Sequence, residues 1–157
     1  MIEVENKNPV VAADAEQRQV RALKGMCFGA IVMILIQYGL GIWVNLFGHL
    51  PDSDHGKGFF DAFGRSVADG PAGLGIHAVF GVILGLTAIQ ALVRGVRSGR
   101  RVSMWMTVIG FVAVVAAGVN GIFFVSYQDN GNSFAMAITA GVGMLAYAMG
   151  LMSLSFD

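Results

Sequence analysis

Charged residues are scarce in this sequence, and four long stretches have none at all. Asp, Glu, Lys and Arg make up 13% of the chain, whereas a soluble domain carries about 25%. The charge-free stretches are residues 25–51, 70–93, 102–128 and 130–156. A bilayer core about 30 Å thick is crossed by roughly 20 residues of helix, so each stretch can cross it once. The sequence therefore predicts an integral membrane protein with four spanning segments.

Several kinds of functional motif are also missing. The single cysteine, Cys27, excludes an intrachain disulfide and is expected to pack as a small apolar residue. The sequence has no phosphate-binding loop and no HExxH, GxSxG or CxxC motif, and no pair of carboxylates lies within the segments expected to cross the membrane. With a net charge of zero and no basic face, the chain is not expected to bind nucleic acid. These absences favour a non-enzymatic protein.

The charge-free stretches do not alternate polar and apolar residues, which favours helices over barrel strands. We expect an all-α integral membrane protein, an antiparallel four-transmembrane-helix bundle. Its spans are predicted at about 26–50, 72–93, 104–127 and 134–156. They make up a membrane domain of residues 26–157, preceded by a cytoplasmic polar tail, 1–25, with a short helix that begins at Asn8-Pro9.

The predicted connections are an outer loop at 51–71, a cytoplasmic basic loop at 94–103 and an outer turn at 128–133. Apolar residues recur at helical spacing within the outer loop, namely Phe59, Phe60, Phe63 and Val67. This pattern predicts a short amphipathic helix that lies at the membrane interface and ends at Gly70-Pro71.

The basic residues are distributed unequally between the two sides. One side carries Arg18, Arg21, Lys24, Arg94, Arg97, Arg100 and Arg101. The segments expected on the opposite side contain only Lys57 and Arg65. The positive-inside rule therefore places both termini in the cytoplasm and predicts a multi-pass protein of the cell (plasma or inner) membrane.

Small residues recur along one face of each of the last three spans. They are Gly81 and Gly85, then Ala113, Ala117 and Gly121, then Gly143, Ala146 and Gly150. Such faces allow helix backbones to approach closely. We expect them to pack within the bundle, and contact with a second copy or a larger membrane complex is the alternative.

Polar residues gather toward the outer ends of the spans. Gln37, Gly41 and Asn45 share one face of the first span, and His77 stacks above a glycine of the second. A polar side chain that faces lipid is costly, so we expect a polar pocket near the outer surface. The candidate cofactor-binding residues are His77, His49, Asn45, Asn120 and Gly81.

The three histidines allow three interpretations. They are structural residues, with His77 hydrogen-bonded to Asn45, Asn120 or a carbonyl group. Alternatively, they hold a copper or zinc ion, for which nitrogen and oxygen ligands are suited. The ligands in that case are His49, His55, His77, Asp52 and Asp54. In the third interpretation His77 and His49 hold a b-type haem across neighbouring helices, with Gly81 making room.

From these patterns we expect a small accessory or binding subunit of the membrane that is not an enzyme. Its pocket would accept a partner, a lipid or a quinone-like molecule. The alternative is a haem or metal protein that serves electron transfer or metal handling.

Overall fold

The computed structural model describes residues 9–47, 58–68 and 70–155, and within these residues all of the regular structure is helical. The helices are α1 (Pro9–Phe47), α2 (Phe59–Ala68), α3 (Ala72–Arg97), α4 (Arg101–Tyr127) and α5 (Asn130–Ser153). All but α2 are long and apolar enough to cross a membrane. The predicted all-α bundle of four spanning helices is confirmed, as is the short helix before the second span.

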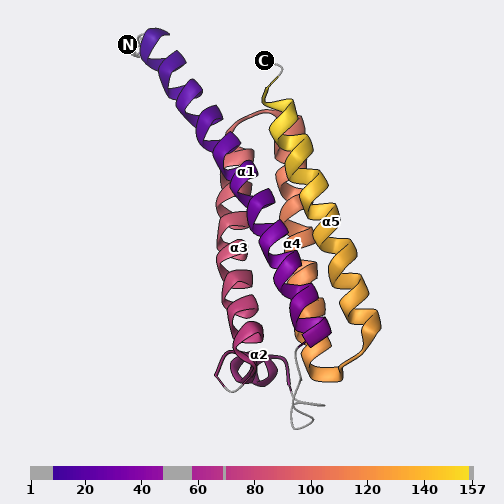
Figure 1. Cartoon of the computed structure of the whole chain (residues 1–157). Coiled ribbons are helices and arrows are strands. Elements are labelled where there is room, and N and C mark those ends of the chain that lie inside the picture. Colours follow the sequence, from indigo (N-terminus) through magenta and orange to yellow (C-terminus); the bar gives the residue numbers. More distant parts are fainter. Residues whose placement is uncertain (1–8, 48–57, 69, 156–157) are drawn as a thin grey trace.

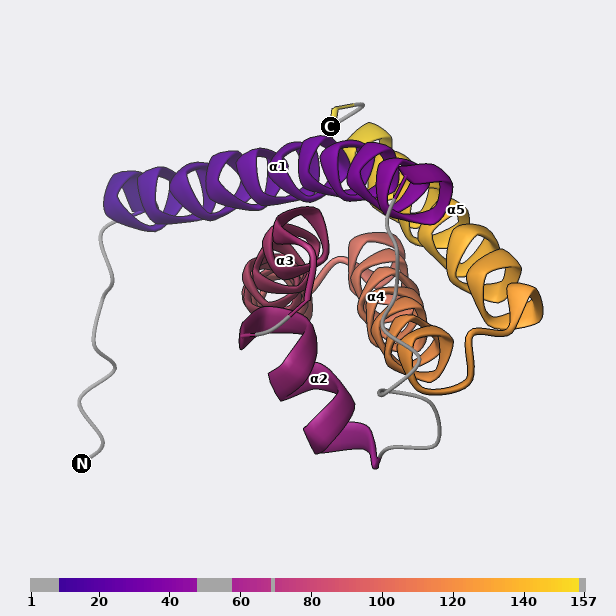
Figure 2. The same cartoon turned by 60° about the horizontal axis from the view of Figure 1, so that its bottom comes forward.

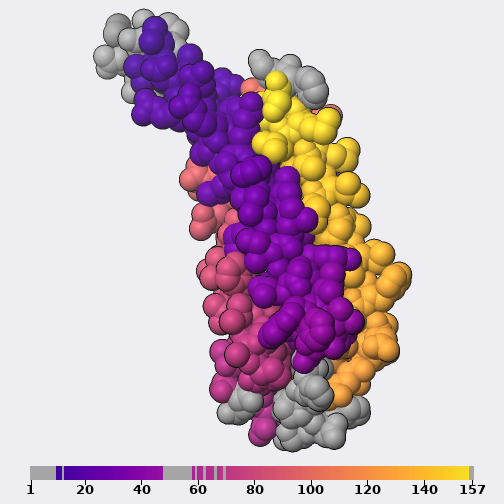
Figure 3. Space-filling model, viewed as in Figure 1, coloured from indigo at the N-terminus to yellow at the C-terminus, as the bar shows by residue number. Residues whose placement is uncertain are grey.

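The four long helices run alternately up and down and pack in a ring (Figure 1). Helix α1 contacts α3 and α5, and α4 contacts the same two helices. Figure 2 shows α1 across the bundle from α4. The space-filling view shows α1 lying obliquely over α3 and α5, with its first turns projecting past the bundle (Figure 3). Space enclosed by the ring is therefore bounded by all four helices.

The two ends of the bundle differ in chemistry. At one end lie the start of α1, the connection between α3 and α4, and the end of α5 (Figure 1). We call this the basic end, because Arg94, Arg97, Arg100 and Arg101 surround that connection. The opposite end holds α2 and the connection between α4 and α5, and we call it the α2 end. The start of α1 and the end of α5 therefore lie at the same end of the bundle, as an even number of antiparallel spans requires.

Helices α1 and α5 begin earlier than the predicted spans at 26–50 and 134–156. Helix α1 is continuous from Pro9 to Phe47, so the predicted tail helix and the first span are one element. Proline is compatible with a first helical turn, and no other proline occurs before Pro51 to interrupt the helix. Helix α5 begins at Asn130, since Oδ1 of Asp129 accepts a hydrogen bond of 3.0 Å from the backbone N–H of Gly131. Because of this cap, the connection between α4 and α5 consists of only Gln128 and Asp129.

Helix α2 lies across one end of the bundle, against α3 and α4 (Figures 1 and 2). Phe63 on α2 is half-buried, whereas Asp61 and Arg65 form an i,i+4 ion pair of 3.8 Å on its exposed side. Of the described side chains predicted to form the apolar side of this helix, Phe63 is therefore the one turned toward the bundle, whereas Phe60 is 87% exposed and Val67 is also exposed.

The half of the bundle toward the basic end has a close-packed core. The ring of Tyr147 lies on Gly110, and the side chain of Thr107 occupies the space where Gly95 lacks a Cβ atom. Cys27 is fully buried, as predicted, and lies near Gly150. Of the small residues predicted to line one face of the last two spans, Ala113, Gly143, Ala146 and Gly150 are buried. Small side chains therefore bring the helices into contact within the chain, as expected.

Candidate functional site: a cavity near the α2 end

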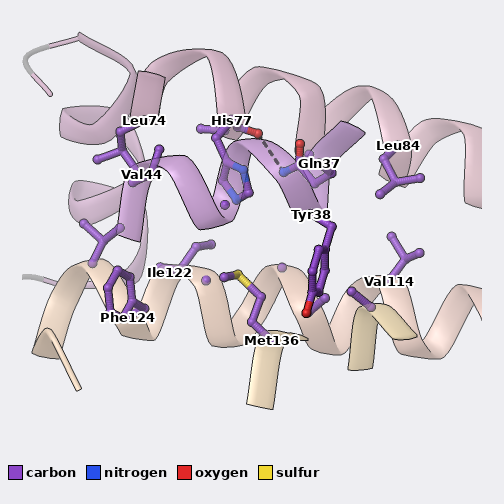
Figure 4. A pocket seen from close by; sticks show the side chains of 18 of the residues that line it. Gln37, Tyr38, Val44, Leu74, His77, Leu84, Val114, Ile122, Phe124 and Met136 are labelled. Atoms are coloured by element: carbon purple, nitrogen blue, oxygen red, sulfur yellow. Dashed lines mark hydrogen bonds between the residues drawn. The ribbon is translucent and has the colours of Figure 1, made fainter. Parts of the chain in front are cut away.

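A cavity of about 280 Å³ lies between the four long helices in the half of the bundle toward α2. Ile34, Leu84 and Val114 bound it on the side of the close-packed core. Phe63 of α2 contributes to its lining from the opposite end. Each of the five helices thus contributes to one apolar chamber, part of which is drawn in Figure 4.

One glycine of the cavity lining, the exposed Gly118, leaves space that no described neighbour fills. Gly118 on α4 lines the cavity, and among the described residues no atom outside its own helix lies within 4 Å of the position a Cβ would take. The same position at Gly121 would lie 3.2 Å from Sδ of Met136, and at Gly41 it would lie 3.2 Å from Cε1 of His77. Gly41 and Gly121 thus allow neighbouring side chains to form the wall, while Gly118 faces open volume.

Besides the hydroxyl-bearing Tyr38, two polar side chains interrupt the apolar lining, Gln37 from α1 and His77 from α3. The amide nitrogen Nε2 of Gln37 donates a hydrogen bond of 2.8 Å to the backbone carbonyl of His77 (Figure 4). A carbonyl oxygen only accepts hydrogen bonds, so this contact fixes the amide orientation and leaves Oε1 as an acceptor. Gln37 therefore joins α1 to α3 at the level of the cavity.

Two buried atoms of this pair lack a partner within the described part of the chain. They are Oε1 of Gln37 and Nδ1 of His77. A buried polar atom without a hydrogen bond costs about 1–3 kcal/mol. Most such atoms in folded proteins are satisfied, and exceptions often occur at binding or catalytic sites. Their presence beside one cavity marks its wall as a candidate binding site.

Tyr38 forms another side of the cavity, next to Gln37 on α1 (Figure 4). The residue is 42% exposed. Its side chain therefore belongs both to the cavity wall and to the outer surface of the helix, which in a membrane faces lipid. A ligand that is longer than the chamber can extend to the bilayer beside this residue.

The structure brings some of the predicted site residues to this cavity. His77 and Gly81 line it, and Gln37 and Gly41, predicted to share the polar face of the first span, do so too. Asn45 is exposed and does not line the cavity. Asn120 also stays outside it, since its Nδ2 donates a hydrogen bond of 2.8 Å to the carbonyl of Ala116 on its own helix. The assignment of these two asparagines to a cofactor site stays a prediction without support from this geometry.

The predicted metal ligands other than His77 lie outside the described residues. They are His49, His55, Asp52 and Asp54. Within the described residues, no group of three or more His, Cys, Asp or Glu side chains is arranged to hold a metal ion. The copper or zinc site and the pairing of His77 with His49 around a haem therefore stay predictions.

Sequence reasoning did not identify Gly118 or Phe63 as residues of the site. The periodicity of α2 predicted an aromatic face, but it gave no indication that Phe63 would reach a chamber inside the bundle. Gly118 has no distinguishing signal, because a glycine that receives a neighbouring side chain and one that leaves open volume have the same sequence pattern. Comparison of the chain with protein-family models, with curated proteins and with solved structures gave no match.

Proposed function

We propose that this multi-pass membrane protein is a small, non-enzymatic binding subunit that holds a lipid-soluble molecule in the cavity near α2. The observation that carries the proposal is the pair of buried polar atoms, on Gln37 and His77, at the wall of an otherwise apolar chamber. Ligand sites are typically apolar concavities with a few polar groups that fix orientation. The bound molecule places its polar group beside Gln37 and His77, with the accompanying small rotations of these side chains.

The size and lining of the cavity define the class of ligand. Its volume of about 280 Å³ is close to the lower bound, about 300 Å³, of common small-molecule sites. One substituted ring or a short polar head fills such a volume, while an attached apolar tail extends beside Tyr38 into the bilayer. A quinone-like molecule, or a lipid with a small hydroxylated head, has this shape and polarity.

The sharpest test uses Trp43 as a reporter beside the site. Its ring packs on Gly73, in the same half of the bundle as the cavity. The only other tryptophan is Trp105, so Trp105→Phe leaves a single emitter. Titration of this variant in nanodiscs with a benzoquinone that carries a ten-carbon tail, and with its quinol, should give saturable changes in fluorescence or in thermal stability.

Two further variants separate binding in the cavity from partition into lipid. Gly118→Leu fills the open volume and should abolish the saturable component. Gly39→Leu adds the same side chain at an exposed position of α1 and should leave that component unchanged. If a correctly folded Gly118→Leu protein retains saturable binding, the cavity is not the site.

The orientation proposed for the site follows from the basic end. The arginines there belong in the cytoplasm by the positive-inside rule, so the cavity lies in the outer half of the membrane. In a Cys27→Ala background, Asp129→Cys should react with an impermeant thiol reagent on intact cells, and Arg97→Cys should not. The reverse labelling pattern would place the cavity in the inner half.

A second candidate function rests on the imidazole of His77 at an apolar cavity wall, since four-helix bundles hold haem through such histidines. Its second ligand would be His49. Absorption spectra of the oxidised and reduced protein, with elemental analysis, test this alternative. A Soret band that shifts on reduction and disappears in His77→Ala would favour haem. Stoichiometric copper or zinc without that band would favour the site of three histidines.

A further inference from the structure

A second hollow lies at the basic end, between α1 and α3, and it has a different chemistry. Its volume is about 390 Å³. Gln19 lines it from α1, and the other lining residues all come from the last turns of α3: Ile89, Gln90, Val93, Arg94 and Arg97. Helix α1 leaves the bundle obliquely at this end (Figures 1 and 3), so the hollow lies where the two helices separate. We call it the basic groove.

The groove changes from cationic to apolar along α3. Arg97 and Arg94 lie nearest the basic end. Val93 and Ile89 follow at helical spacing and are 41% and 46% exposed. Leu86, one turn further into the span, is 55% exposed. From the basic end inward, positive charge thus gives way to exposed apolar side chains, as phosphate gives way to acyl chain in a phospholipid, and the amide of Gln90 comes between Val93 and Ile89 along the helix.

The arginines of the groove are available to an external anion. The nearby Arg100 pairs with Glu16 of α1, with Nη2 and Oε1 3.6 Å apart. Neither Arg94 nor Arg97 forms an ion pair with another described residue. Both are exposed at the groove. A guanidinium matches phosphate oxygens in a bidentate geometry, and basic pockets between helices at the cytoplasmic surface bind anionic lipid head groups.

We propose that the basic groove is a binding site for one anionic phospholipid. Its phosphate contacts the guanidinium groups of Arg94 and Arg97. Gln19 and Gln90 flank the head group and supply amide donors, and the first part of an acyl chain lies along Val93 and Ile89. This site is separate from the cavity near α2, and neither proposal depends on the other.

The experiment is a lipid titration of the purified full chain, followed by native mass spectrometry. Phosphatidylglycerol should bind with a stoichiometry of one at concentrations where phosphatidylcholine does not. The double variant Arg94→Gln/Arg97→Gln should weaken that binding about 30-fold, given what each basic residue near an anionic lipid contributes. The matched control Arg21→Gln/Arg101→Gln removes the same charge at the same end from residues that do not line the groove, and it should bind almost as wild type.

Three results would overturn the proposal. Equal weakening by both double variants would show diffuse attraction to a charged surface. Equal binding of phosphatidylcholine would show that the anionic charge is not recognised. Competition by inorganic phosphate or glycerol phosphate as effective as that by the lipid would show a site for free phosphate, in which Val93 and Ile89 have no part.

Discussion

Gly110 and Gly118 lie on the same helix, about 12 Å apart along its axis, and their surroundings are opposite. At Gly110, atoms of the Tyr147 ring lie 2.7–2.9 Å from the place a Cβ would occupy. At Gly118, no described atom outside the helix lies within 4 Å of that place. The first glycine allows tight packing and the second leaves a chamber. A glycine-rich span therefore forms either a close-packed core or a cavity, depending on which side chains the opposite helix places against it.

The same contrast extends to the two halves of the bundle. The half toward the basic end is dense, and the hydrophobic core gathers there around Tyr147, Cys27 and Ile34. The half toward α2 holds the cavity and only a small cluster formed by Val44, Leu74 and Val125. Regions with few packed contacts open at lower free energy than the core. The hollow half can therefore adapt to a ligand while the dense half maintains the fold.

The largest expected effect on stability is the difference between alanine substitutions at Gly110 and at Gly118. Gly110→Ala should destabilise the protein by about 1–3 kcal/mol, because the new Cβ forces the Tyr147 ring to move. Gly118→Ala should leave stability unchanged or slightly raised, since its Cβ enters open volume and alanine favours the helix. Reversible unfolding in mixed micelles measures both. Equal destabilisation by the two variants would show that Gly118 does not face open volume.

A smaller effect of opposite sign is expected at Tyr147. Its hydroxyl is buried without a hydrogen-bond partner in the described part of the chain. Tyr147→Phe keeps the ring on Gly110 and removes the unsatisfied group, so stability should rise by about 1 kcal/mol. The control is Tyr127→Phe, at an exposed residue of the same type, which should change little. A loss of stability in Tyr147→Phe would show that the hydroxyl has a partner or a function.

Gln37→Leu should separate stability from binding in the hollow half. The substitution removes the hydrogen bond to the His77 carbonyl and also the unpartnered Oε1. These two changes oppose each other, so the free energy of unfolding without ligand should shift by less than about 1 kcal/mol. The thermal stabilisation that the quinone or quinol probe gives the wild type should be lost. Undiminished stabilisation would exclude Gln37 as a ligand contact.

The smallest effect is expected at Asn45. Its side chain is exposed on α1 and does not line the cavity. Asn45→Leu should change stability by less than about 0.5 kcal/mol and leave probe binding unchanged. Loss of probe binding in this variant would extend the site beyond the cavity and restore the sequence-based assignment of Asn45.

The sequence predicts the four spans because hydrocarbon excludes charge, and charge-free stretches of the right length are visible directly. It predicts the helix ends less well. Asp129 determines where α5 begins through its capping hydrogen bond, on which polarity does not report, whereas the start of α1 at Pro9 follows from the position of that proline. The short connection between α4 and α5 makes these two helices antiparallel neighbours.

For the site, helical spacing predicted that Gln37, Gly41 and Asn45 share one face; Gln37 and Gly41 line the cavity together with His77, whereas Asn45 does not. The sequence did not indicate that the Asn120 amide would donate a hydrogen bond to a carbonyl of its own helix. Whether such a side chain hydrogen-bonds to its own backbone or to a neighbouring helix depends on its rotamer, which cannot be read from the periodicity of the sequence. Nor does the sequence reveal open volume at Gly118, because that volume depends on the positions of all the surrounding helices.

The continuity of α1 has a mechanical consequence. Gln37 at the cavity and Gln19 at the basic groove are 18 residues apart on this one helix, a lever of about 27 Å. No proline lies between them to act as a hinge. A ligand that tilts α1 on entering the cavity would therefore swing Gln19 relative to α3 and alter the width of the groove. Binding of a ligand in the cavity would then change the shape of the groove near the opposite membrane surface through rigid-body motion of α1 alone.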